Sequence, residues 1–224
     1  MNISTMLNTR KLFLTLSVIT AFTLASCGGE EKTETTETQA ATKDTCFYSY
    51  NKTTGAQVRW TAFKTTAKKP VGGQFDQVNV TAGAKSTKIT DVLKTIKFNI
   101  PTASTNTANE DRDAKIVNSF FGAMNATDLI IGQVKDAIGD NNSGTCTFYL
   151  TLNNVEQEAT LNYTLEDALL TLTGEIDLIN FQAENAVAAL NNVCEDLHKG
   201  EDGITKTWSI VELSIETTLN KNCH

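Results

Sequence analysis

The sequence predicts an all-β domain of roughly eight antiparallel strands, interrupted by two short helices. Three observations support this fold class. Apolar and polar residues alternate along several Thr-rich segments, which is typical of strands with one buried face. The opposite face of each segment is polar, as in antiparallel sheets that meet water on one side. Two other segments repeat their apolar residues every three or four positions, as helices do.

The strands are clearest in the second half of the chain. Phe148 and Leu150 alternate with Thr147 and Tyr149, and Asn153-Asn154 follows as a predicted hairpin turn, because Asn tolerates a positive φ. In the first strand we expect Val58, Trp60 and Ala62 to point inward and Arg59, Thr61 and Lys64 to point outward. The eight strands are expected near residues 58–62, 71–78, 92–100, 128–135, 145–152, 159–165, 170–178 and 209–219.

The first helix is predicted over residues 110–121. Asn109 can cap its first turn with the side-chain oxygen, and acidic side chains in that turn favour the positive end of the helix dipole. The acidic residues are Glu110, Asp111 and Asp113. Phe120 and Phe121 lie at its apolar end. The second helix is predicted over residues 183–199 and should stop at Gly200.

Periodicity alone does not say what fills the space that the apolar faces enclose. Eight strands can pack as two sheets with interlocking side chains. They can equally close into a barrel that either just fills or holds one small ligand. The pattern favours neither arrangement over the other.

The N-terminal region predicts export and a lipid anchor. Arg10 and Lys11 precede an apolar run, and residues 1–26 read as a lipoprotein signal peptide. The run is too short and too rich in Thr for a membrane-spanning helix. Leu24-Ala25-Ser26-Cys27 matches a lipobox, so Cys27 is expected to be acylated and to become the mature N-terminus. Residues 27–45 lack large apolar side chains and are expected to form a disordered Thr/Glu-rich tether to a domain at 46–224.

The charge argues against nucleic acid as a partner. The formal net charge of the whole chain is −7, and removing residues 1–26 takes away Arg10 and Lys11 and no acid, which makes it −9. Nucleic acids and anionic headgroups are recognised by basic surfaces. The membrane is therefore expected to be reached through acyl chains on Cys27.

Residues 106–121 also resemble the signature of the YceI-like family. A strand ends in Pro101-Thr102-Ala103-Ser104-Thr105-Asn106-Thr107, Asn109-Glu110-Asp111-Arg112-Asp113 follows, and a Phe pair closes the segment. The Gly-rich strand from Val71 to Val78 is similar to the second strand of that family. One departure concerns Lys115, which stands where the family usually has His.

The resemblance implies an extended, lipocalin-like, eight-stranded antiparallel barrel that binds a long-chain lipid such as an isoprenoid quinone or a polyprenyl compound. No cofactor is implied other than a bound isoprenoid or fatty-acid-like lipid. The helix 110–121 would then act as a lid over one mouth, with Asn109, Glu110, Asp111, Arg112 and Asp113 as a structural corner. The expected lipid-binding residues are Val58, Trp60, Phe75, Phe98, Ile100, Phe120, Phe121, Phe148, Leu150, Leu161, Tyr163, Leu172, Ile176 and Leu213.

Four cysteines remain beside Cys27, and an even number in an exported domain predicts two disulfides with three possible connectivities. In an up-and-down barrel the first and last strands are antiparallel neighbours. This favours a Cys46–Cys223 bridge and leaves Cys146–Cys194 as the second pair.

Catalysis and metal binding are not expected. Glu110, Asp111 and Asp113 are close in sequence and are explained by helix capping. Cys194 and His198 have a spacing that suits one metal, yet a closed zinc site needs four ligands and the chain offers only His224 as a further imidazole. Taken with the lipid ligand that the family resemblance implies, the expected function is an exported, non-enzymatic lipid carrier anchored in the cell envelope, at the periplasmic or surface face of the outer membrane. The alternative is a non-catalytic envelope interaction or stress protein with a filled barrel core.

Overall fold

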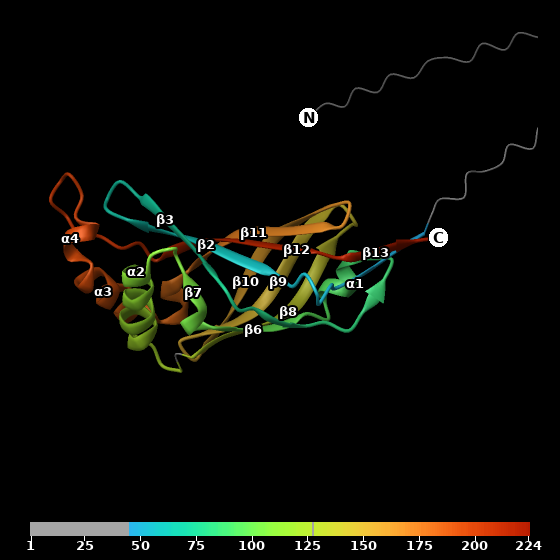
Figure 1. Ribbon diagram of the computed structural model, residues 1–224, viewed down its shortest axis with the longest axis horizontal. Coiled ribbons are helices and arrows are strands. Elements are labelled where there is room, and N and C mark those ends of the chain that lie inside the picture. Colours follow the sequence, from blue (N-terminus) through green and yellow to red (C-terminus); the bar gives the residue numbers. More distant parts are fainter. Residues whose placement is uncertain (1–44, 127) are drawn as a thin grey trace, which may run out of the picture. The chain divides into compact units, whose positions relative to one another are not determined.

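A computed structural model describes residues 45–126 and 128–224 of the chain. These residues form one domain built on a strongly curled, antiparallel sheet (Figure 1). The predicted signal peptide, Cys27 and the tether up to residue 44 lie outside the described residues. No helix in the described part of the chain is both long and apolar enough to span a membrane.

The large sheet has ten strands in the order β4-β6-β8-β9-β10-β11-β12-β2-β3-β7. Its strands are β2 (Gln57–Lys64), β3 (Lys69–Phe75), β4 (Asn79–Thr81), β6 (Lys97–Pro101), β7 (Thr105–Asn106), β8 (Leu129–Gly139), β9 (Ser143–Leu152), β10 (Val155–Glu166), β11 (Leu169–Asp177) and β12 (Ile210–Thr218). A second sheet of three strands has the order β13-β1-β5. It consists of β1 (Cys46–Ser49), β5 (Lys85–Ser86) and β13 (Asn220–Cys223).

The all-β class and the eight long strands are confirmed, but the predicted strand number is wrong. The additional strands β1, β4, β5, β7 and β13 have two to four residues each, which is too short for an alternating pattern to show. The sheet also keeps two edges, β4 and β7. The gap between them is crossed by the chain itself, which runs from β6 through the 3₁₀ turn η1 (Thr102–Ser104) into β7.

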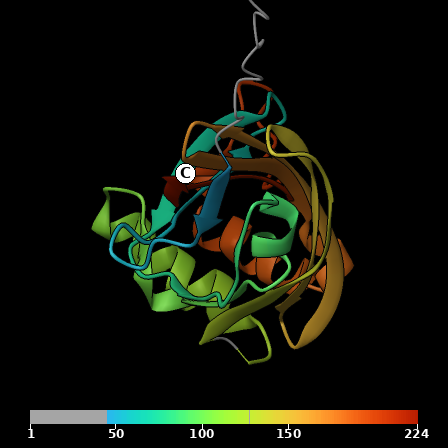
Figure 2. The same cartoon turned by 90° about the vertical axis from the view of Figure 1, so that its right-hand side faces the viewer.

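The hairpin turn at Asn153-Asn154 is confirmed, with φ values of 54° and 59°. Val92 was assigned to a strand and lies instead in α1 (Ile89–Leu93). This helix enters the curled sheet at the end where β1 and β13 lie (Figure 2). Ile89, Val92 and Leu93 are almost completely buried there. A helix of five residues is too short to establish a helical period in the sequence.

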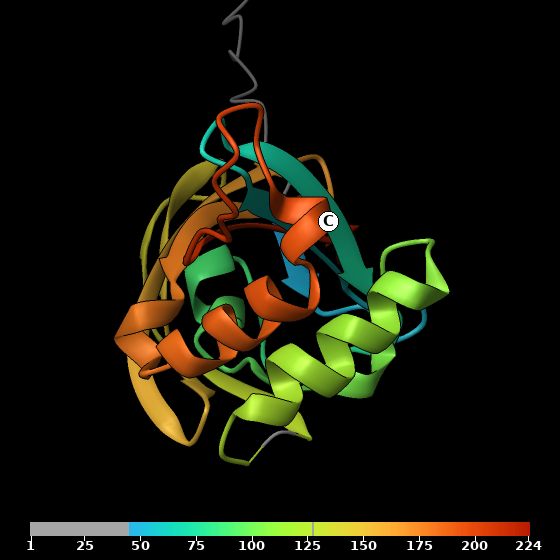
Figure 3. The same ribbon diagram turned by 90° about the vertical axis from the view of Figure 1, so that its left-hand side faces the viewer.

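Helices also cover the other end of the sheet (Figure 3). The predicted lid consists of α2 (Glu110–Lys115), a π-helical turn η2 (Ile116–Phe120) and a 3₁₀ turn η3 (Phe121–Ala123). The second predicted helix is divided into α3 (Glu184–Val193) and α4 (Glu195–His198), and a 3₁₀ turn η4 (Leu178–Phe181) leads into it. The division falls at Cys194, where φ is −114° and ψ is 17°.

Two hydrophobic clusters divide the interior. The first lies at the α1 end and contains α1 together with Phe148, Leu161, Tyr163 and Leu172. The second lies at the lid end and contains Ile116, Phe121, Leu150 and Phe181 among others. Phe98 packs against both clusters. The end of the curled sheet that contains α1 is thus filled by side chains.

The Cys46–Cys223 disulfide is formed, and it joins two residues that are opposite each other in the β1–β13 pair. The predicted Cys146–Cys194 pair is wrong, because both cysteines are free and buried. Cys146 belongs to the first cluster, whereas Cys194 lies at the break between α3 and α4. The pairing had been reached by elimination, and the fold places these two cysteines at opposite ends of the domain.

Candidate functional site

An apolar cavity of about 520 Å³ lies between the curled sheet and the helices at the lid end. Strands β2, β3, β11 and β12 supply its wall, and α2, η2 and α3 cover it. The cavity volume is within the range of volumes that hold small apolar ligands. The first hydrophobic cluster closes the other end of the sheet, so the cavity has a floor.

Six of the predicted lipid-binding residues line this cavity: Trp60, Phe75, Phe120, Phe121, Ile176 and Leu213. The other eight do not line it. Phe148, Leu161, Tyr163 and Leu172 belong to the filled end, and Leu150 belongs to the cluster beside the cavity. Val58 and Ile100 are buried outside the cavity, and Phe98 lies between the two clusters. All eight were predicted from their position on the inward face of the strands. That face runs from the cavity to the filled end of the domain, so position on it does not identify a cavity residue.

Other lining residues were missed by the sequence analysis. Val187 and Leu190 follow the helical period of α3, and Val211 follows the alternation of β12. The sequence could therefore indicate that these side chains face inward, but not that they line a cavity. Lys64 was predicted to point outward, and the structure places it in the cavity wall. Lys64 lies two residues after Ala62, so it continues the inward-facing series of Val58, Trp60 and Ala62. This alternation is the sequence signal that could have predicted its inward orientation.

The lid is fixed to the sheet by the corner that precedes it. Asn109 Oδ1 accepts a hydrogen bond from the Arg112 backbone N–H at 2.9 Å, which confirms the predicted cap. Asp113 Oδ1 accepts from the backbone N–H and from the hydroxyl of Thr107, at 2.8 and 2.6 Å. The side-chain amide of Asn106, in β7, donates a hydrogen bond of 2.8 Å to the carboxylate of Asp76, which lies in the loop after β3. Of the three acidic residues in this turn, Asp113 thus holds the corner through its bonds to Thr107.

The π-helical turn shapes the inner face of the lid. The Phe121 backbone N–H donates to the carbonyl oxygen of Ile116, five residues earlier. Ile116 and Phe121 are buried, and the Phe120 and Phe121 rings pack edge to face with centroids 5.0 Å apart. Single π-helical turns inside helices occur frequently at functional sites. Here the turn lies where the lid contacts the cavity.

Trp60 forms part of the cavity wall because Gly73 has no side chain. The two residues are paired across β2 and β3, and the indole ring lies over Gly73. A methyl group on Gly73 would lie 2.7 Å from Cε2 and 2.8 Å from Cη2 of Trp60. The indole N–H is buried and has no hydrogen-bond partner among the described residues.

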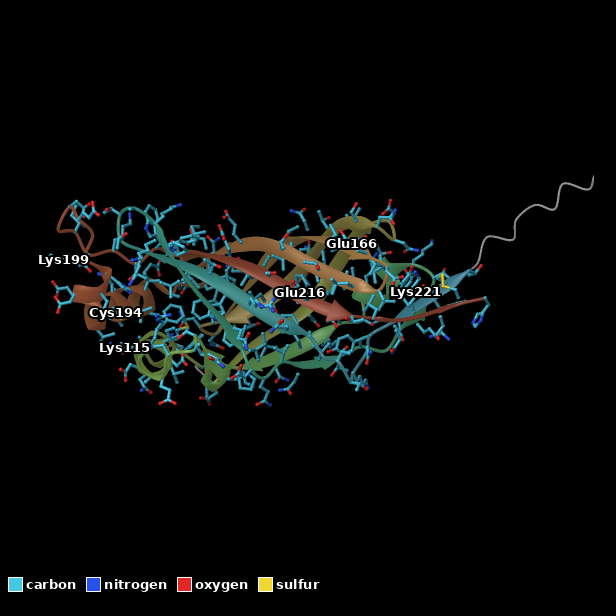
Figure 4. All side chains as sticks on the ribbon, turned by 45° about the horizontal axis from the view of Figure 1, so that its top comes forward. Lys115, Glu166, Cys194, Lys199, Glu216 and Lys221 are labelled. Carbon is cyan, nitrogen blue, oxygen red and sulfur yellow. A yellow bond between two sulfur atoms is a disulfide. The ribbon has the colours of Figure 1, made fainter. Side chains whose placement is uncertain are left out.

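Three cations lie among the lining residues: Lys64 from β2 and Arg112 and Lys115 from α2. Burial lowers the pKa of Lys64, and the neighbouring Lys69 and Arg112 lower it further. Burial raises the pKa of the Cys194 thiol, whereas Lys115, Lys64 and Arg112 act in the opposite direction. All three cations are therefore close enough to act on the same thiol. Figure 4 shows Lys115 and Cys194 at the same end of the domain, away from the disulfide.

No salt bridge within residues 45–126 and 128–224 involves any of these three cations. Lys115 and Asp111, four residues apart on α2, do not form a salt bridge. Asp111 is the one acidic residue among the described residues that line the cavity. The rim of the cavity thus carries more positive than negative charge, although the chain as a whole is acidic.

His198 also lines the cavity and is held by hydrogen bonds. Its Nδ1 lies 2.7 Å from Thr207 Oγ1, and the Thr207 hydroxyl donates to Asn191 Oδ1 at 3.0 Å. Burial lowers the pKa of His198, and Lys64 lowers it further. Among the described residues, no group of three or more His, Cys, Asp or Glu side chains is arranged to hold a metal ion.

The curled sheet and the one-ended apolar cavity define a lipocalin-like architecture. The chain belongs to the YceI-like family, whose YceI-like domain matches residues 48–217. This confirms the family resemblance found in the sequence. No curated protein matches the chain.

Solved structures share the fold at low sequence identity. A polyisoprenoid-binding domain from Saccharophagus degradans, implicated in plant cell wall breakdown, aligns with a TM-score of 0.55 and 14% identity over 80% of this chain and 100% of its own. BcnA from Burkholderia cenocepacia aligns with a TM-score of 0.51 and 13% identity over 75% of this chain and 96% of its own. At these identities the likeness concerns the fold alone.

Proposed function

We propose that this protein is an exported, membrane-anchored carrier that holds a long-chain apolar lipid, of the isoprenoid quinone or polyprenyl type, in the cavity beneath its lid. The observation that carries the proposal is the cavity of about 520 Å³ with its apolar wall and its helical cover. Membership of the YceI-like family supports a lipid ligand, and the similar Saccharophagus degradans domain is described as polyisoprenoid-binding.

Burial of hydrocarbon supplies the affinity. Each methylene group removed from water stabilises the complex by roughly 0.8 kcal/mol, so ten of them contribute on the order of 8 kcal/mol before the costs of association. The wall residues that provide this contact include Trp60, Phe75 and Leu213 from the sheet and Phe120 and Phe121 from the lid. Binding of this kind requires no reacting group, and we propose no catalytic step.

Mass spectrometry of an organic extract tests the proposal. The protein is purified from its host, extracted with organic solvent and compared with a parallel extract of the variant Leu213→Arg. The variant places a charge in the cavity wall, which disfavours a hydrocarbon chain. A stoichiometric lipid in the native extract, strongly reduced in the variant extract, supports the carrier. An extract without lipid favours the alternative of a non-catalytic envelope interaction protein.

We also propose that acyl chains on Cys27 anchor the domain in the outer membrane. The lipobox at residues 24–27 supports this proposal. Two acyl chains suffice for stable anchoring, whereas a single chain gives marginal binding. The native chain should partition into the detergent phase of a Triton X-114 separation, and Cys27→Ala should lose incorporation of labelled palmitate. Retention of the label in Cys27→Ala would contradict the anchor.

A further inference from the structure

The cavity combines an apolar interior with three cations that form no salt bridge within the described part of the chain. Lys64 comes from the sheet, and Arg112 and Lys115 come from the lid, so residues far apart in the sequence bring positive charge to one site. Lys64 and Lys115 are half-buried. None of the three forms a salt bridge with a carboxylate among the described residues, and Asp111 is the one acidic residue that lines the cavity with them, so their mutual repulsion is only partly offset.

From this arrangement we propose that the ligand is a single-chain amphiphile with an acidic head, a carboxylate or a phosphate, held by Lys64, Arg112 and Lys115. The inference rests on the proposed function and specifies the ligand class of the same cavity. A guanidinium and two ammonium groups offer several donors to the oxygens of such a head. The acidic head would add the negative charge that Asp111 alone does not supply.

The floor of the cavity limits the length of the tail. The cavity of about 520 Å³ lies at one end of the curled sheet only. α1 and the first hydrophobic cluster occupy the space beyond. A tail that is longer than the cavity would therefore leave its remainder outside.

The two tryptophans of the chain make binding directly measurable. Trp60 and Trp208 are its only tryptophans, and both line the cavity. Their fluorescence therefore reports the entry of a ligand. The full-length protein is reconstituted in phosphatidylcholine vesicles and titrated with hexadecanoate, hexadecyl phosphate or hexadecanol, which share one tail and differ in the head.

We expect hexadecanoate or hexadecyl phosphate to bind the native protein about tenfold more tightly than hexadecanol, because charge-assisted hydrogen bonds form only with an acidic head. The double variant Arg112→Gln/Lys115→Gln should lose this preference and keep its affinity for hexadecanol. Lys199→Gln is the matched control, since Lys199 is exposed at the same end of the domain and does not line the cavity (Figure 4).

Each outcome separates the inference from the proposed function. Preference for one acidic head over the other identifies a carboxylate or a phosphate. Equal binding of all three amphiphiles overturns the acidic head and leaves the lipid carrier intact. Binding of none of them overturns the acidic single-chain ligand, and the carrier proposal is then decided by the organic extract alone. A neutral forty-carbon prenol that binds as tightly as the sixteen-carbon acids would overturn the limit on tail length.

Discussion

At the scale of single residues, Gly73 decides how the wall of the cavity is built. Its missing side chain leaves room for the Trp60 indole, and the neighbouring Gly72 has no such role. A Cβ on Gly72 would meet only the Trp60 carbonyl oxygen, at 3.8 Å, which is ordinary contact. The two adjacent glycines thus offer a matched comparison within one strand.

We predict that Gly73→Ala lowers the free energy of unfolding by about 1–3 kcal/mol, because the new methyl group forces the indole out of its place. Gly72→Ala should change it by less than about 0.5 kcal/mol. Urea unfolding followed by tryptophan fluorescence measures both variants. Equal stability of the two variants would contradict the assigned role of Gly73.

His198 makes the stability depend on pH. Burial and Lys64 hold its pKa below its ordinary value of 6.5, so the folded protein binds the proton less readily than the unfolded chain. The contribution of neutral His198 to stability is therefore complete above pH 6.5 and is lost as the pH falls below that value.

The expected result is a smaller loss of stability between about pH 7.5 and about pH 5 in His198→Gln than in the native protein. His224→Gln is the control, because His224 is exposed at the C-terminal end. The free energy of unfolding is measured by urea denaturation at each pH. An identical pH dependence of native protein and His198→Gln would refute the argument.

At the scale of elements, the lid is a composite helix with a rigid start and an irregular end. The cap at Asn109 and the Asp113–Thr107 bonds fix α2 to the end of β7. The π-helical turn then directs Phe120 and Phe121 toward the cavity. We predict that opening of the lid exposes these rings while leaving the corner intact, so that the rings set the barrier to ligand release.

We predict that Phe120→Ala/Phe121→Ala speeds the release of preloaded hexadecanol about tenfold or more, since each 1.4 kcal/mol of lost contact changes a rate constant tenfold. Transfer of labelled hexadecanol to acceptor vesicles measures the rate. The control is Phe47→Ala, which removes an aromatic ring at the opposite end of the domain and should leave the release rate unchanged. The single variant Phe120→Ala tests the same point with less disturbance. Release at the native rate in both lid variants would reject the lid.

At the scale of the whole molecule, the Cys46–Cys223 bridge joins residues separated by 177 positions. It fixes β1 to β13 beside the end that α1 fills. The bridge therefore restrains almost the entire domain, and a restraint on so long a loop removes much entropy from the unfolded chain.

We expect Cys46→Ala/Cys223→Ala to lower the free energy of unfolding by about 2–5 kcal/mol. Alkylation of the denatured, unreduced protein gives a second test. It should label Cys146 and Cys194 and leave Cys46 and Cys223 unlabelled, as peptide mass spectrometry would show. Labelling of all four cysteines would contradict the bridge.

Local signals in the sequence were sufficient for the long strands, the Asn153-Asn154 turn and the capped helix at Asn109. Each of these depends on neighbours a few residues away, which the sequence displays directly. The family signature at residues 106–121 was likewise local. The short strands and α1 were missed because segments of two to five residues are too short to show a period in the sequence.

The sequence by itself predicted an all-β domain with an apolar inner face, a helix capped by Asn109 and a disulfide between Cys46 and Cys223. Only the tertiary structure decided which part of that face lines a cavity. Alternation is a property of one strand, and it is the same for Leu161 in the filled end and Leu213 in the cavity wall. The difference arises because α1 occupies the space at one end, whereas no buried segment of the described chain occupies the other.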